Sequence, residues 1–256
     1  MKILIDKDAG KVILADRDGE KVIPYYSKEA FEVLSEEWLA ISWHAKYSYT
    51  FTWFGRPIIQ YPEDVIRLQE VIYLTKPTVI VETGVAHGGS LVFYASLFKA
   101  MGIGRLVIGV DVEIRPHNRR AIADHELAEL ITLVEGNSVA PETITQVGNL
   151  LQPDDRVLVI LDSNHSYSHV AAELKAYSRF VSPQSYIIAT DGIMRLVAEG
   201  PRAKREWKND NPANAAEDFA RANPCYVIEQ PAWRFNESPL GKAITAWPSA
   251  YLKRVA

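Results

Sequence analysis

Apolar and polar positions divide most of the chain into blocks of strand length and helix length. From residue 78 onward, strand-length apolar runs stand at 78–82, 106–111, 131–135, 157–162, 185–191 and 226–230. Helix-length stretches lie between them at 89–101, 118–125, 141–151, 166–181 and 214–222. In one of these, Val170, Leu174, Tyr177 and Val181 recur at helical spacing and form a single apolar stripe. Several strands are apolar almost throughout, which is typical of strands covered on both faces. The pattern predicts an α/β fold with a doubly wound, mostly parallel, Rossmann-like sheet.

The N-terminal part of the chain follows a different pattern. Apolar runs at 3–5 and 12–15 flank a turn-like segment and predict a hairpin, and Ser27 is placed to cap a helix over 28–40. Alternating aromatic residues from Tyr47 to Trp53 predict an extended segment. We therefore expect a small N-terminal extension over 1–62 and a main domain over 63–256, which begins with a helix at 63–74 and has its last strand within 243–255. The irregular segments 192–212 and 231–242 are long enough to be lids or binding loops.

Composition and charge exclude several classes of protein. The 256 residues carry a net charge of −4, which gives no electrostatic footprint for a nucleic-acid partner. A single cysteine, Cys225, excludes an intrachain disulfide and a thiolate metal cluster, and fits a reducing compartment. The charged N-terminus lacks the apolar core of a signal peptide, and no apolar run is long enough to span a membrane. We expect a cytoplasmic protein without a membrane partner.

The first strand of the main domain runs into a glycine-rich turn, Glu82-Thr83-Gly84-Val85-Ala86-His87-Gly88-Gly89-Ser90. Glycines let the backbone approach a ligand closely, and the following helix points its N-terminal N–H groups toward it. A dinucleotide fold would prefer Gly-x-Gly-x-x-Gly around a pyrophosphate. Here Glu82 would repel a pyrophosphate and attract an α-amino group, which favours S-adenosylmethionine over NAD. Gly84, Gly88 and Ser90 are expected to contact this cofactor, and His87 either shapes its pocket or is exposed.

Polar residues at the next strand ends suit the nucleoside part of a cofactor. Asp111 ends the second strand, at the position where a carboxylate usually grips a ribose diol. Asn137 and Ser138 follow the third strand, where small polar residues suit an adenine edge. Asp162, at the end of the fourth strand, is counted with these cofactor contacts.

The fourth and fifth strands end in acidic residues. Asp162 and Asp191 are expected at the same edge of the sheet, where two carboxylates can share a hard cation such as Mg²⁺. A substrate hydroxyl on that ion would be acidified and held in line with the methyl group. His165, three residues after Asp162, is placed to act as general base. The alternatives are that both aspartates only cap the following segments and that His165 only begins a helix.

These motifs together resemble the cephalosporin hydroxylase-like family of S-adenosylmethionine methyltransferases, which includes O-methyltransferases acting on deoxysugars of macrolides. The resemblance covers residues 53–191 well and the tail more loosely. It is carried by Phe54-Gly55-Arg56-Pro57-Ile58, Gln69-Glu70-Val71-Ile72, the glycine turn, Leu161-Asp162-Ser163-Asn164-His165-Ser166, Val181-Ser182-Pro183 and Asp191. It implies a class I methyltransferase fold and, in the sugar O-methyltransferases, Mg²⁺ on the aspartate of Asp-x-x-His with its histidine as base.

The resemblance places these roles on Asp162 and His165, with one departure. The following strand in those relatives ends in Glu-Asp, and both residues bind the metal. Here the pair is Thr190-Asp191, so that a neutral hydroxyl replaces one carboxylate ligand. We therefore expect a Mg²⁺ site at Asp162, Asp191 and Thr190 that binds the ion more weakly, or an enzyme that works without metal.

The acceptor side of the site is less defined by sequence. Trp53, Tyr61 and Trp207 are candidates for stacking on a sugar, and the alternative for Trp53 is the hydrophobic core. A basic run, Arg202, Lys204 and Arg205, suits an anionic acceptor such as a nucleotide-linked sugar, or is simply a solvated face. The aromatic segment also suits a subunit contact, so a homo-oligomer is expected. The leading hypothesis is a sugar O-methyltransferase; the alternatives are a methyltransferase for a phenolic acceptor, an NAD-linked oxidoreductase and a non-catalytic cofactor-binding protein.

Overall fold

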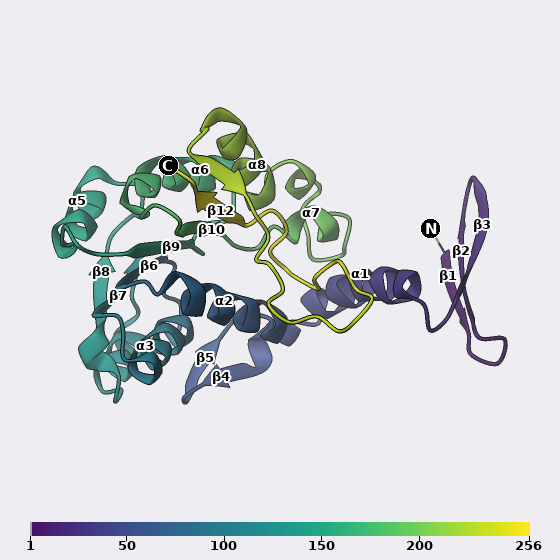
Figure 1. Cartoon of the computed structure of the whole chain (residues 1–256), viewed down its shortest axis with the longest axis horizontal. Helices are drawn as coiled ribbons and strands as arrows, with labels where there is room; N and C mark the ends of the chain where they lie inside the picture. Colours follow the sequence, from purple (N-terminus) through teal and green to yellow (C-terminus); the bar gives the residue numbers. More distant parts are fainter. Residues whose placement is uncertain (1) are drawn as a thin grey trace.

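A computed structural model describes residues 2–256 and contains one large central sheet. Seven strands lie in the order β11–β12–β10–β9–β6–β7–β8 (Figure 1). Five of them are parallel neighbours: β6 (Val79–Thr83), β7 (Leu106–Asp111), β8 (Ile131–Glu135), β9 (Val157–Leu161) and β10 (Tyr186–Ala189). The last strand, β12 (Tyr251–Arg254), runs antiparallel between β10 and β11 (Tyr226–Ile228). The prediction of a doubly wound, mostly parallel sheet is confirmed.

Helices cover both faces of this sheet. One hydrophobic core joins it to α2 (Pro62–Thr75), α3 (Gly89–Met101) and α4 (Pro116–Ala123). A second core lies on the opposite face, under α5 (Pro141–Leu150), α6 (Tyr167–Tyr177) and α8 (Pro212–Ala222). Four of these helices begin with proline, whose fixed φ suits the first helical turn and whose missing N–H has no intrahelical partner there. Strands β6 and β9 are buried throughout, as their unbroken apolar sequences predict.

Three predicted boundaries are wrong for identifiable reasons. The helix expected over 166–181 ends at Tyr177 and continues as a 3₁₀ turn, η3 (Ser178–Phe180). The strand expected to reach 191 ends at Ala189, because Asp191 adopts a left-handed conformation with φ of 59°. The segment from Tyr47 is a 3₁₀ turn, η1 (Tyr47–Thr50), and only its end is extended, as β4 (Phe51–Trp53) paired with β5 (Arg56–Ile58). This β4–β5 hairpin packs on α3.

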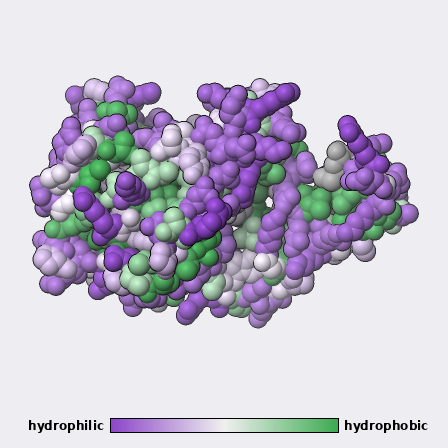
Figure 2. Space-filling model, turned by 90° about the horizontal axis from the view of Figure 1, so that it is seen from above, coloured by the Kyte–Doolittle hydropathy of each residue, from purple (hydrophilic) through white to green (hydrophobic). Residues whose placement is uncertain are grey.

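The N-terminal extension stands at one end of the molecule. The expected hairpin gains a third strand, giving β1 (Lys2–Asp6), β2 (Lys11–Asp16) and β3 (Gly19–Pro24). Ser27 accepts a hydrogen bond from the Ala30 N–H and caps α1 (Lys28–His44), which links the small sheet to the main body (Figure 1). Figure 2 shows apolar side chains gathered on the surface at this end of the molecule. Exposed apolar residues of the small sheet include Leu4, Ile5 and Val22.

The two long irregular segments differ in structure. Residues 192–212 contain a short helix, α7 (Met194–Val197), and a 3₁₀ turn, η4 (Arg205–Lys208). Residues 231–242 form no helix or strand within the described chain. No helix within residues 2–256 combines the length and apolar character needed to cross a membrane.

Candidate active site

The glycine turn after β6 brings two strand ends into close contact. Gly84 has φ of 95°, and a Cβ atom there would lie 2.0 Å from the carbonyl oxygen of Asp162. A Cβ on Gly88 would meet the Ile122 side chain, and one on Gly89 would lie 2.1 Å from the carbonyl oxygen of Pro57. These glycines are therefore required by the packing of the chain itself, which places the turn beside the end of β9.

A polar clamp that the sequence did not predict holds the outer side of this turn. The guanidinium of Arg56 donates two hydrogen bonds to the carbonyl oxygen of His87, at 3.0 and 2.6 Å, and a third to Asn118. The Asn118 amide in turn donates to the carbonyl oxygen of Ala86. Ala86 has φ of 44°, so the clamp stabilises a strained backbone. The only sequence signal for it was the position of Arg56 in the Phe-Gly-Arg-Pro-Ile segment.

Glu82 lies fully buried beneath the turn. Its two carboxylate oxygens accept hydrogen bonds from Ser90 at 2.5 Å and from the Tyr94 hydroxyl at 2.8 Å. Burial, and then the nearby Asp162 carboxylate, raises the pKa of Glu82 to about 8. A cation placed here would relieve this unfavourable charge, which fits the expected α-amino group. Ser90 therefore contacts Glu82 directly, whatever it contacts in the cofactor.

The strand ends predicted to hold a nucleoside do lie along one edge of the sheet. Asp111 accepts hydrogen bonds from the backbone N–H groups of Val85 and Ala86, at 2.8 and 3.2 Å, and so braces the glycine turn. Asp111 Oδ1 also accepts from the Glu113 N–H at 3.2 Å, so of the about four acceptor positions of a carboxylate one remains for a ribose hydroxyl. Asn137 is exposed, and its side chain closes a local turn by accepting from the Val139 N–H.

Ser138 belongs to a buried network that the sequence did not predict. Its hydroxyl lies 3.1 Å from His169 Nε2, and its carbonyl oxygen accepts a hydrogen bond from Tyr177. His169 also contacts Ser163, which donates to the fully buried Glu173. Hydrogen bonding to Glu173 raises the pKa of His169. The network ties the loops after β8 and β9 together, and His169 lies four residues after His165 in the chain.

The fourth and fifth strand ends bring the predicted catalytic residues together. Donor atoms of Asp162, His165 and Asp191 all lie within 4.8 Å of one another, and His165 Nε2 is 3.3 Å from Asp191 Oδ2. Burial, followed by the Asp191 charge, raises the pKa of Asp162. Among residues 2–256, no lysine or arginine forms an ion pair with either aspartate. Two adjacent carboxylates and an imidazole are donors that fit a divalent cation.

Thr190 lies beside Asp162, one of the two aspartates expected to bind the metal. Its side chain is almost fully buried, and its hydroxyl lies 2.5 Å from Asp162 Oδ1 and 3.0 Å from the Leu161 carbonyl oxygen. The single hydroxyl hydrogen is shared between these two acceptors. Thr190 thus orients Asp162 within the site.

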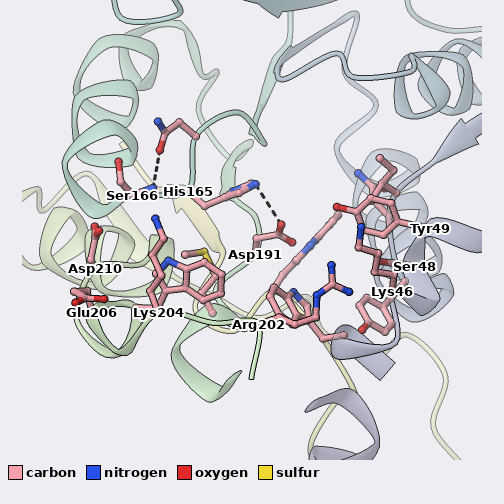
Figure 3. Close-up of a pocket in the computed structure, with 18 residues that line it drawn as sticks. Lys46, Ser48, Tyr49, His165, Ser166, Asp191, Arg202, Lys204, Glu206 and Asp210 are labelled. Atoms are coloured by element: carbon pink, nitrogen blue, oxygen red, sulfur yellow. Dashed lines mark hydrogen bonds and ion pairs between the residues drawn. The ribbon is translucent and has the colours of Figure 1, made fainter. Parts of the chain in front are cut away.

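A cavity of about 830 Å³ opens in front of this cluster (Figure 3). His165 and Asp191 point toward each other in its wall, and Lys46, Tyr49 and Arg202 lie on the other side. Segments from the N-terminal extension and from residues 192–212 form most of the wall. The lining residues are Trp43, Lys46, Ser48, Tyr49, Ile59, Gln60, Tyr61, Asn164, His165, Ser166, Asp191, Met194, Arg202, Lys204, Glu206, Trp207, Asp210 and Trp247.

The acceptor-side predictions fare unequally. Tyr61, Trp207, Arg202 and Lys204 line the cavity as expected. Trp53 does not: it packs edge-on against Phe93 and donates a hydrogen bond to Ser96, which corresponds to its alternative role in the core. Arg205 is not among the lining residues.

Comparisons with known proteins show the family to which the chain is similar. The family model described as "Rhamnosyl O-methyltransferase/CmcI" matches residues 45–255. The rhamnosyl O-methyltransferase of Mycobacterium leprae (strain TN) is 26% identical over 180 residues, which are 67% of this chain and 76% of that protein. That of Mycobacterium tuberculosis (strain ATCC 25618 / H37Rv) is 28% identical over 168 residues, covering 62% and 67%.

Solved structures show the same fold. An apo structure of CmcI has a TM-score of 0.54 and 21% identity, over 81% of this chain and 77% of that one. A CmcI structure with Mg and SAM has a TM-score of 0.52 and 21% identity, over 81% and 78%. At this identity the structural likeness establishes the fold.

Proposed function

We propose that the chain, which belongs to the rhamnosyl O-methyltransferase/CmcI family, methylates a sugar hydroxyl in the 830 Å³ cavity. Members of this family are S-adenosylmethionine-dependent O-methyltransferases. The observation that carries the proposal is the placement of Asp162, His165 and Asp191 within 4.8 Å of one another, with His165 and Asp191 in the cavity wall. This arrangement places a general base, His165, and two carboxylates beside the cavity that would hold the sugar hydroxyl.

The proposed reaction forms one oxygen–carbon bond, breaks one sulfur–carbon bond and releases one proton. When bound, S-adenosylmethionine supplies an electrophilic methyl group, and Mg²⁺ lowers the pKa of a nearby hydroxyl. His165 takes the proton from the acceptor hydroxyl as the oxygen attacks. Asp191, 3.3 Å from Nε2, stabilises the imidazolium that results. The aromatic walls exclude water and hold the acceptor in line.

The edge of the sheet provides the proposed cofactor site. Glu82 and Asp162 face the amino-acid end of the donor, and Asp111 holds the ribose. The remaining contacts come from Gly84, His87, Gly88, Ser90, Asn137 and Ser138. The position of all these residues at the carboxyl ends of β6 to β9 supports this assignment, because open α/β sheets bind ligands at that edge.

Asp162 and Asp191 are the proposed metal ligands, with His165 beside them. Because Thr190 donates to Asp162 rather than adding a negative charge, we expect Mg²⁺ to bind more weakly than at a three-carboxylate site. Isothermal titration of metal-stripped protein with S-adenosylhomocysteine, with and without Mg²⁺, tests the cofactor and the ion separately. Micromolar binding that tightens with Mg²⁺ is expected, and no binding in either condition would contradict the cofactor site.

The acceptor is proposed to be a sugar, presented as a glycoside or linked to a nucleotide. Tyr61 and Trp207 offer aromatic faces, and Arg202 and Lys204 offer positive charge for a phosphate. A panel of rhamnosides, nucleotide sugars and catechols, assayed for S-adenosylhomocysteine release, tests this choice. Turnover of sugars and not of catechols is expected; the reverse preference would replace the sugar with a phenolic acceptor.

We also propose that the chain forms a homo-oligomer through its N-terminal extension. Leu4, Ile5 and Val22 are 48%, 45% and 57% exposed on a three-stranded sheet that stands off from the main body (Figures 1 and 2). Exposed apolar patches of this kind commonly mark protein contacts. Light scattering on the purified protein should give a mass above 28.7 kDa, and a monomer at micromolar concentration would refute the proposal.

A further inference from the structure

Gln60 has an unusual environment in the wall of the active-site cavity. It follows β5 and precedes α2, and only 4% of its surface is exposed. It lines the same cavity as His165 and Asp191. Among the described residues, neither its amide nitrogen nor its amide oxygen has a hydrogen-bonding partner. The side chain therefore holds two donors and one acceptor carbonyl unused inside the protein.

Such an arrangement is costly unless a ligand completes it. A buried polar group without a partner loses its hydration and gains nothing in return. Two neighbouring hydroxyls do have partners: Tyr61 contacts Ser42, and Tyr94 donates to Glu82. Other buried side chains within residues 2–256, such as Thr83 and His44, also have an atom without a partner, but of this set only Gln60 lines the cavity. The missing partner of Gln60 would therefore come from the cavity.

The amide lies beside the catalytic cluster. Gln60 shares the cavity wall with His165 and Asp191, the two members of the cluster that line the cavity. The terminal amide rotates about a soft torsion, so a small turn is sufficient to present it to a ligand.

We infer that Gln60 binds a second hydroxyl of the acceptor, next on the ring to the hydroxyl that is methylated, so that the enzyme selects vicinal diols. This inference rests on the proposed function and adds to it the substrate class. A hydroxyl both donates and accepts, and so does a primary amide, so a neighbouring hydroxyl can either donate to the Gln60 carbonyl oxygen or accept from its amide nitrogen. With His165 on one hydroxyl and Gln60 on the next, the acceptor ring has a fixed orientation toward the methyl donor.

The variant Gln60→Leu tests the inference, because leucine keeps much of the volume and removes the amide. We expect kcat/KM for a rhamnoside to fall roughly tenfold or more, mainly through KM, since one hydrogen bond is lost on binding. The melting temperature of the unliganded protein should stay equal or rise, because an unpaired buried amide is gone. A merely structural role would instead lower the melting temperature and leave KM unchanged.

Ser185→Ala is the matched control. Within residues 2–256, Ser185 also has a buried hydroxyl without a partner, but it precedes β10 and so lies at the amino ends of the strands, away from the cavity. This variant should leave kcat and KM within twofold of the unmodified protein.

Deoxy acceptors provide the decisive comparison. With a rhamnoside that lacks the neighbouring hydroxyl, the unmodified protein and Gln60→Leu should show equal kcat/KM, because the contact is absent in both. If Gln60→Leu lowered kcat/KM equally for the rhamnoside and for its deoxy analogue, the inference would be overturned. A parallel loss of affinity for S-adenosylhomocysteine would also overturn it, because Gln60 would then bind the cofactor. Failure of the unmodified protein to methylate any sugar would instead remove the proposed function itself.

Discussion

Replacing His165 with alanine is the sharpest perturbation of the proposed chemistry. His165 Nε2 lies 3.3 Å from Asp191, and the side chain is 30% exposed, so it reaches the cavity without supporting the core. Positioned general bases contribute roughly 10²–10⁴-fold to rate. We expect the lower part of this range, because Asp162 and Asp191 remain in place. The predicted loss in kcat is about 100- to 1,000-fold, or about 3–4 kcal/mol of barrier.

Two measurements separate this effect from damage to the site. Release of S-adenosylhomocysteine gives kcat, and isothermal titration gives the affinity for S-adenosylhomocysteine, which should stay within about threefold of the unmodified value because less than 1 kcal/mol is at stake. His117→Ala, on the exposed side of α4, is the matched control and should leave both unchanged. A kcat for His165→Ala near that of the unmodified protein would refute its role as base. Loss of affinity in parallel with kcat would show a general disturbance.

Three further predictions concern the cofactor site and stability. Asp111→Ala removes the acceptor for three backbone N–H groups and the proposed ribose contact, so titration should show a roughly 10- to 100-fold weaker affinity for S-adenosylhomocysteine. An unchanged affinity would show that the nucleoside binds elsewhere. Gly84→Ala places a Cβ 2.0 Å from the Asp162 carbonyl oxygen and should lower the free energy of unfolding by more than about 3 kcal/mol. The control Gly102→Ala has open space around the new Cβ and should lower it by about 1 kcal/mol. Equal losses of unfolding free energy in the two variants would contradict the close approach at Gly84. Burial raises the pKa of Asp64 to about 7, so the folded protein holds a proton that the unfolded chain releases, and the stability this proton contributes declines as the pH rises from about 4 to 7. In denaturant unfolding, the free energy of unfolding of Asp64→Asn should therefore fall by about 2 kcal/mol less than that of the unmodified protein between pH 5 and 7. The same pH dependence in both proteins would show that Asp64 does not hold a proton.

The sequence predicted the central sheet closely because its strands are buried on both faces. Strands 106–111 and 131–135 and the helix 89–101 have the predicted bounds. The third strand of the extension, β3, was missed because its polar and charged residues leave only Val22 and Ile23 as an apolar signal. The break at Tyr177 was missed because the apolar stripe continues past it to Val181, whereas the chain there turns into η3. The spacing of apolar residues shows which face of a helix is buried. It does not show at which residue the helix ends.

The meeting of the fourth and fifth strand ends was predictable because the carboxyl ends of parallel neighbouring strands lie at one edge of the sheet. This rule brings Asp162, His165 and Asp191 together without any knowledge of loop structure. Contacts between segments far apart in sequence had no such signal. The hydrogen bonds from Arg56 to His87 and the burial of Gln60 depend on how the β4–β5 hairpin packs on α3. No local sequence pattern specifies that packing.

The most direct test of the central claim follows the methyl group itself. S-adenosylmethionine with a deuterated methyl group is incubated with a rhamnoside and either the unmodified protein or His165→Ala, and the product is analysed by mass spectrometry and NMR. The structure predicts that the unmodified protein places the label on one ring hydroxyl oxygen, with one S-adenosylhomocysteine formed per label, and that His165→Ala forms this product far more slowly. Label on another atom, or equal product from both proteins, would contradict the assignment of this cavity as the site of sugar O-methylation.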